Sequence, residues 1–139
     1  MEELVRARGH DHVAATHGST LEVTTDDWLT PAGDCIVGVE ADRAPADFAT
    51  AFLTACRRDA PMTAVLRAGD HRATVRGHGA PGLTFESDRS AVLRTGDYVD
   101  DRTVMVGADA AAADLDRDLV GALADGAALE LHLRVRTDA

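Results

Sequence analysis

Short segments of this chain recur in the same order in its two halves, and this repetition constrains the fold more than any other feature. The 139-residue chain places the matching segments 68, 70, 67 and 67 residues apart. The pairs are Arg8-Gly9-His10 with Arg76-Gly77-His78, Asp27-Trp28-Leu29 with Asp97-Tyr98-Val99, Ala41-Asp42 with Ala108-Asp109, and Ala46-Asp47-Phe48 with Ala113-Asp114-Leu115. We therefore predict a single domain over residues 1–139, made of two tandem repeats at about 5–67 and 73–135.

Each repeat carries the sequence patterns of strands around one helix. Alternating or β-branched apolar residues predict strands over residues 4–8, 14–24, 34–40, 63–67, 71–76, 102–108 and 129–135. Residues 45–57 have a helical pattern, because Phe48, Phe52 and Cys56 are four residues apart. The connections are too short for a parallel βαβ series. The expected fold class is mainly β (α+β), with two pseudo-symmetric repeats forming an antiparallel β-sandwich or irregular barrel and one helix per repeat.

The charged residues indicate the solvent in which the chain folds. The formal net charge is −10, from 24 acidic and 14 basic residues. All 14 basic residues are arginines, 18 of the acidic residues are aspartates, and lysine is absent. Near-molar salt shortens the screening length to about 3 Å, so surplus negative charges repel one another less there. This composition therefore predicts a halophilic protein.

Several functional classes are disfavoured by the sequence. No segment approaches the roughly 20 apolar residues of a membrane-spanning helix, and the acidic start at Glu2 and Glu3 is unlike a secretion signal. Cys35 and Cys56 are too few for a disulfide framework. The negative net charge does not favour nucleic acid as a partner. We therefore expect a cytoplasmic protein without a membrane partner, whose ligand is a small molecule or another protein.

Several further segments are distinctive as a set. They are Arg8-Gly9-His10, Ala15-Thr16-His17, Gly33-Asp34-Cys35-Ile36, Asp97-Tyr98, Asp101-Arg102-Thr103 and Ala113-Asp114-Leu115. With them the chain resembles one archaeal family, which is catalogued as domain of unknown function 371. The resemblance covers nearly the whole chain, and it implies a compact, mainly β archaeal protein, with a composition like that of haloarchaeal members. It transfers no catalytic residues.

Residues present in only one repeat are the best candidates for function, because a shared fold needs its structural residues twice. At the offsets above, His17 corresponds to Phe85 and Cys35 to Arg102. Cys35 is a candidate nucleophile, with His10 or His17 as the base and Asp34 as the group that orients it. The candidate catalytic residues are therefore His10, His17, Asp34 and Cys35, and the candidate ligand-binding residues are Arg102 and Thr16.

The sequence leaves two functional classes and one cofactor open. His10, His12 and His17 form a cluster of metal-ligand type, so a divalent metal is the cofactor to consider, with exposed histidines as the alternative interpretation. A small buried thiol at Cys35 would be ordinary packing. One class is a ligand-binding or small hydrolase-like domain with one pocket in the first repeat. The other is a non-catalytic module that binds protein, nucleotide or RNA.

The acidic composition generates a testable prediction about salt. Because charge repulsion destabilises the folded state at low ionic strength, the melting temperature should rise steeply from low salt to molar KCl. Thermal unfolding followed by circular dichroism across that range would measure this. A flat profile would contradict the halophilic interpretation.

Overall fold

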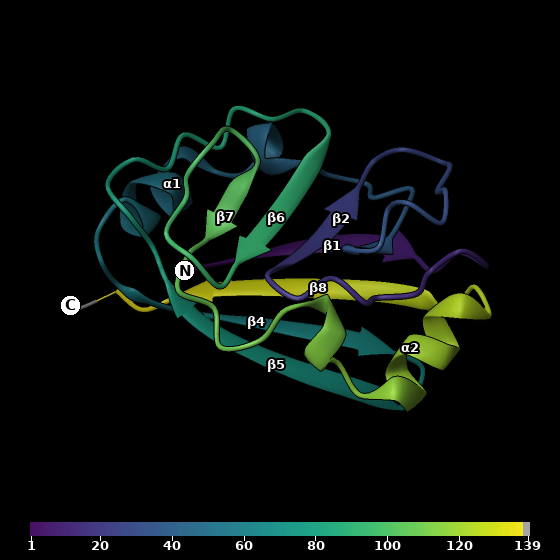
Figure 1. Ribbon diagram of the computed structural model, residues 1–139. Coiled ribbons are helices and arrows are strands. Elements are labelled where there is room, and N and C mark those ends of the chain that lie inside the picture. Colours follow the sequence, from purple (N-terminus) through teal and green to yellow (C-terminus); the bar gives the residue numbers. More distant parts are fainter. Residues whose placement is uncertain (138–139) are drawn as a thin grey trace.

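Alternating apolar residues build a large antiparallel sheet in the computed structural model, which describes residues 1–137 (Figure 1). Its strands are β1 (Glu2–Arg8), β4 (Pro61–Ala68), β5 (His71–His78) and β8 (Ala128–Val135), in the spatial order β1-β8-β4-β5. In β4 and β8 every second side chain is buried, as a strand with one covered face requires. The inward side chains of these two central strands are Met62, Ala64, Leu66, Ala68, Leu129, Leu131, Leu133 and Val135.

A smaller sheet lies against the large one. Its strands are β2 (Thr20–Thr24), β3 (Ile36–Gly38), β6 (Ser90–Arg94) and β7 (Thr103–Met105), in the order β3-β2-β6-β7. The central pair β2–β6 is antiparallel as expected, but β3 pairs with β2 and β7 pairs with β6 in parallel. Each parallel pair is joined by a loop without a helix, so the expectation of antiparallel pairing fails for these two short strands.

Two short helices complete the fold. They are α1 (Thr50–Cys56) and α2 (Arg117–Ala124), each preceded by a 3-10 turn, and Figure 1 shows them at opposite ends of the sandwich. The prediction of one continuous helix over 45–57 is wrong, because Phe48 has extended backbone (φ −71°, ψ 151°). The amide of Ala49 donates to the Glu3 carboxylate at 2.6 Å, which anchors this break to β1. Phe48 is nevertheless buried and packs edge-on against Phe52 and Phe85.

The core lies between the two sheets and the helices. Leu21 and Val23 of β2 face inward opposite the inward residues of β4 and β8, and Phe52 and Leu123 close the ends. The sheets form a sandwich, and neither is closed on itself as a barrel within residues 1–137. The predicted mainly β, α+β fold class is therefore confirmed, with the sandwich as the observed alternative.

The two halves of the chain contain the same elements in the same order. Three strands, a 3-10 turn, an α-helix and a fourth strand occupy residues 2–68 and again residues 71–135. Backbone hydrogen bonds recur too: Arg8 pairs with Val39 as His78 pairs with Val106. These recurrences support the interpretation as two repeats, which stays a prediction until the halves are superposed.

The recurring hydrogen bonds also correct the alignment of the repeats. The bonds of Arg8 with Val39 and of His78 with Val106 give an offset of 70 residues before the loop at residues 25–35 and of 67 residues after it. Likewise, Ala15 and Phe85 both have positive φ, at 50° and 49°. The offset of 68 assigned to Arg8-Gly9-His10 is therefore wrong by two residues. In the corrected alignment His10 corresponds to Ala80, and His17 corresponds to Ser87.

The halves exchange strands and helix contacts. β1 pairs with β8 and β4 pairs with β5, so each half supplies neighbours for the other. A glycine in each half lies against the last turn of the opposite helix. A Cβ added at Gly9 would meet the Leu123 carbonyl oxygen at 1.9 Å, and one at Gly79 would meet the Cys56 carbonyl oxygen at 2.0 Å. Close approach of backbones, rather than positive φ, thus explains both glycines.

This contact predicts the effect of adding one methyl group. Gly9→Ala and Gly79→Ala should each lower the free energy of unfolding by about 2 kcal/mol or more, because backbone atoms cannot rotate away from the new methyl. Chemical denaturation would measure the loss. Gly18→Ala is the matched control, since a Cβ there meets nothing within 4 Å. Equal stability of all three variants would show that the close contact does not constrain the fold.

Candidate functional site

The structure places the predicted site residues in two separate groups. His10 lies with Asp11 and His12 in the turn that follows β1. His17, Cys35 and Arg102 lie around β2 and the loops that precede β3 and β7. The groups differ in chemistry, so each is described by itself.

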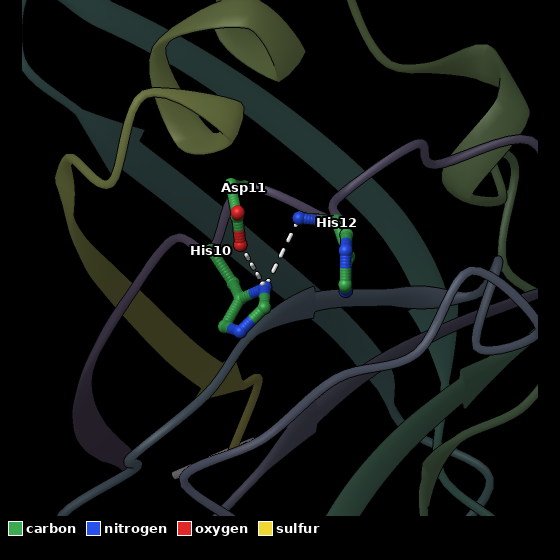
Figure 2. Close-up of side chains that lie close together, drawn as sticks. All are labelled: His10, Asp11 and His12. Carbon is green, nitrogen blue, oxygen red and sulfur yellow. Dashed lines mark hydrogen bonds and ion pairs between the residues drawn. The ribbon is translucent and has the colours of Figure 1, made fainter.

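The turn after β1 brings two imidazoles and one carboxylate together (Figure 2). One ligand atom each from His10, Asp11 and His12 lies within 4.8 Å of the others. The His10 Nδ1 atom is 2.9 Å from the Asp11 carboxylate and 3.0 Å from the backbone nitrogen of His12. The His12 Nδ1 atom is 2.6 Å from the carbonyl oxygen of Leu29. His17 does not belong to this group.

His17 has a structural role that the sequence did not reveal. Its Nδ1 atom accepts hydrogen bonds from the amides of Ser19 (3.2 Å) and Thr20 (3.1 Å). At the equivalent position the Ser87 hydroxyl accepts from the amides of Arg89 (3.2 Å) and Ser90 (3.1 Å). The imidazole and the hydroxyl therefore stabilise the same turn. His17 was a functional candidate because the aligned residue was Phe85. Phe85 is instead equivalent to Ala15, so this reason for a functional His17 is wrong.

The Cys35 thiol faces a buried carboxylate. Its Sγ atom is 3.7 Å from Glu22 Oε1. Burial raises the pKa of the Cys35 thiol, and the negative charge of Glu22 raises it further, while a hydrogen bond with Thr20 acts in the opposite direction. A nucleophilic cysteine needs surroundings that favour the thiolate. This environment favours the neutral thiol, and Asp34 adds to the effect through its charge.

Arg102 reaches the same carboxylate from the second half of the chain. Its guanidinium is 3.8 Å from Glu22 and 3.4 Å from Asp100. Burial acts to raise the pKa of Asp100, but hydrogen bonds from Thr103 and Arg102 and the charge of Arg94 together lower it. Arg102 is therefore paired with acidic side chains of its own chain. Thr16 and Asp34 meet through the backbone, where the Thr16 amide donates to the Asp34 carbonyl at 3.0 Å.

A third group of residues was missed by the sequence analysis, and it covers the outer face of the large sheet. Strand pairing and alternation place six arginines and two glutamates at outward positions of β1, β8, β4 and β5. Their formal charge is +4, on a chain of net charge −10. We call this surface the arginine face; its arginines are Arg6, Arg8, Arg67, Arg72, Arg76 and Arg134, and its glutamates are Glu2 and Glu130.

Half of these arginines have a carboxylate partner and half do not. Arg6 pairs with Glu130, Arg134 with Glu2, and Arg8 with Glu40. Within residues 1–137, no carboxylate lies within 4.0 Å of the guanidinium groups of the other three, which are Arg67, Arg72 and Arg76.

Two of the unpaired arginines stand directly opposite each other in the sheet. Arg67 of β4 and Arg72 of β5 are cross-strand partners, and like charges at such positions are destabilising. Together with His132 and Arg134 they line a surface pocket of about 130 Å³, which Thr63 and Val65 also border. The pocket gathers cationic side chains from three strands.

The sequence contained a signal for this face. Arginines stand two or four residues apart in strand segments, as in Arg6 and Arg8 and in Arg72 and Arg76. Because side chains alternate along a strand, such spacing places them on one face. The signal was not usable without the strand order, since β1, β8, β4 and β5 are not consecutive in the chain.

Comparison with known proteins gives a family and one relative. Residues 5–136 match the model of the family described as domain of unknown function DUF371. The chain is also similar to the uncharacterised protein MJ0206 of Methanocaldococcus jannaschii, with 35% identity over 126 residues. The matched region covers 91% of this chain and 93% of that protein.

The environment of Cys35 predicts slow alkylation. Because the raised pKa keeps the thiol protonated at pH 7 to 8, iodoacetamide should react more slowly with the folded protein than with free cysteine. Burial raises the pKa of Cys56 to about 12, so Cys56 should not contribute. Glu22→Gln removes the nearby charge, lowers the pKa of Cys35 and should shift the pH–rate profile to lower pH.

Glu86→Gln is the matched control for that variant, because Glu86 is exposed and absent from the groups that shift the Cys35 pKa. Mass spectrometry of the alkylated protein over a pH series would give both profiles. Alkylation of the unmodified protein faster than that of free cysteine near pH 7 would contradict the assignment and favour a nucleophilic Cys35.

Proposed function

We propose that this chain, which belongs to the DUF371 family, binds nucleic acid. The binding surface is the arginine face, and it contacts the phosphate backbone. This is the non-catalytic binding-module alternative, which named RNA among its partners; DNA is added here because it presents the same kind of phosphate backbone. The surroundings of Cys35 favour a binding role over a catalytic one. The thiol lies beside the Glu22 carboxylate, which favours its neutral, less nucleophilic form.

One observation carries the proposal: Arg67 and Arg72 stand opposite each other, and among residues 1–137 neither has a carboxylate partner. Like charges on neighbouring strands cost stability unless an anion lies between them. Guanidinium groups present two parallel N–H donors, a geometry that suits phosphate. A phosphate group bound in this pocket would therefore offset the repulsion.

The extent of the face favours a polymer over a single small anion. The outward arginines are distributed over all four strands of the large sheet, and neighbouring strands are about 4.8 Å apart. One phosphate can contact only part of this surface, whereas a phosphodiester backbone presents successive charges across it. The outward positions of these four strands carry no Phe, Tyr or Trp side chain, so extensive base stacking is not the expected mode.

Net charge alone did not favour this partner, because it averages over the whole surface. Local potential governs the approach of a charged ligand at short range, and it differs between faces of the same protein. Screening in concentrated salt leaves the direct contacts between guanidinium and phosphate as the main attraction. A halophilic, cytoplasmic setting is part of the same proposal. Among the described residues, no helix has the length and apolar character needed to cross a membrane.

The proposal predicts the salt dependence of binding. Fluorescence anisotropy with labelled RNA and DNA duplexes should show binding that weakens as salt rises, equally for unrelated sequences. In the double variant Arg67→Ser and Arg72→Ser, the slope of log K against log salt should fall in magnitude by about 2, because two phosphate contacts are lost.

Arg58→Ser is the matched control, since Arg58 is an exposed arginine in the loop between α1 and β4 rather than at an outward position of the large sheet. It should leave the slope unchanged. Inorganic phosphate and a nucleoside monophosphate serve as competitors that separate a small-anion site from a polymer site. Binding of these small anions without binding of either duplex would overturn the proposal, as would equal slopes for the double variant and the control.

A further inference from the structure

We propose that His10, Asp11 and His12 form a binding site for a divalent transition-metal ion such as Zn²⁺. The site lies in the turn after β1 (Figure 2), and it is independent of the nucleic-acid proposal. Two imidazoles and one carboxylate are a common ligand set for such ions, with solvent in the remaining positions.

The distances fit a shared ion. One ligand atom from each residue lies within 4.8 Å of the other two. The His10 Nδ1 and Asp11 Oδ1 atoms are 2.9 Å apart. Two ligands that are each about 2.1 Å from one ion and at roughly a right angle are separated by a similar distance. The backbone turn therefore already holds two ligand atoms at coordination spacing.

The His12 ring has a hydrogen-bond partner that is typical of metal-binding histidines. Its Nδ1 atom is 2.6 Å from the Leu29 carbonyl oxygen, so this nitrogen carries the hydrogen and donates it. The lone pair of the neutral ring is then on Nε2. Ligating histidines commonly donate their other ring N–H to a carbonyl, which sets the tautomer and the ring orientation.

The His10 Nδ1 atom has two neighbours that call for opposite protonation states of the ring. Its Nδ1 atom accepts the His12 backbone N–H at 3.0 Å, which requires a lone pair on that nitrogen. The same atom is 2.9 Å from the Asp11 carboxylate, where a lone pair would face another lone pair. If Nδ1 is protonated instead, it donates to Asp11 but can no longer accept from His12. A divalent ion bound by the Nδ1 lone pair and the Asp11 carboxylate removes the repulsion between these two atoms, in exchange for the hydrogen bond from the His12 N–H.

The second half of the chain shows that the fold does not need these side chains. In the corrected alignment the residues equivalent to His10, Asp11 and His12 are Ala80, Pro81 and Gly82. The amide of Val13 donates to the His10 carbonyl at 2.9 Å, and the amide of Leu83 donates to the Ala80 carbonyl at 3.2 Å. The same turn therefore forms without any ligating group. The three side chains are left available for a ligand.

The surroundings supply a further carboxylate. His10 and Asp11 border a surface depression that Arg8 and Asp125 also line. Arg8 is paired with Glu40, so its charge is partly compensated. Asp125 adds a second carboxylate to the lining of the depression, so it contributes negative charge beside the site and can contact the ion through water.

The experiment is a metal titration of the full-length protein after treatment with a chelator. Zn²⁺ in competition with a chromophoric indicator should reveal one bound ion per chain, and Co²⁺ should give visible absorption typical of nitrogen and oxygen ligands. Zn²⁺ should also raise the melting temperature, because it binds the folded state. Replacing the turn by its equivalent, with His10→Ala, Asp11→Pro and His12→Gly, should weaken binding by at least about tenfold and abolish the melting shift.

His17→Ser is the matched control, because it also removes one imidazole and introduces the hydroxyl that caps the equivalent turn at Ser87. It should bind Zn²⁺ as tightly as the unmodified chain. Circular dichroism confirms that each variant is folded. Absence of stoichiometric Zn²⁺ binding, or binding of equal affinity by the replaced turn, would overturn the proposal. Loss of binding in His17→Ser would also overturn it, since the ion would then lie elsewhere.

Discussion

Pairing of β4 with β8, and of β2 with β6, joins the two halves of this chain at the centre of each sheet. Neither half forms the large sheet alone, because there its strands pair with strands of the other half: β1 lies on β8 and β5 lies on β4. The helices depend on the same arrangement, since Gly9 and Gly79 each lie against the end of the helix from the opposite half. Every surface described above is a consequence of this exchange.

The shared backbone separates structural residues from those free to carry chemistry. His17 and Ser87 have different side chains, yet each accepts hydrogen bonds from the two equivalent backbone amides of its own turn. The difference between the two residues therefore carries no functional information. His10-Asp11-His12 and Ala80-Pro81-Gly82 also form the same turn, but here the first set supplies ligating groups that the backbone does not use. A side chain is informative when its equivalent shows that the fold can form without it.

The charge of the protein is distributed unevenly. Acidic residues dominate the chain as a whole, while the outward positions of the large sheet carry six arginines and two glutamates. On the small sheet, by contrast, Arg94 and Arg102 are paired with Asp100, and Arg102 also approaches Glu22. Arginines thus serve two purposes: near β6 and β7 they pair with acidic side chains, and on β4 and β5 they are cations without a carboxylate partner among residues 1–137.

The sequence by itself indicated most of the strands, because burial of one face imposes a period of two on strands and the chain shows it in β4 and β8. It did not indicate β6, whose residues are buried without such alternation. The order of elements in both halves was also readable from the recurring segments. The alignment of the first strand of one repeat with that of the other could not be read from the sequence. Offsets of 68 and 70 differ by two residues, so both place the same side chains on the same face, and only the backbone hydrogen bonds distinguish them. Local spacing also suggested one helix through Phe48, where a contact between Ala49 and Glu3 of β1 breaks it. Only the tertiary structure decided which arginines share a surface, because β1, β8, β4 and β5 become neighbours through pairings between residues far apart in the chain.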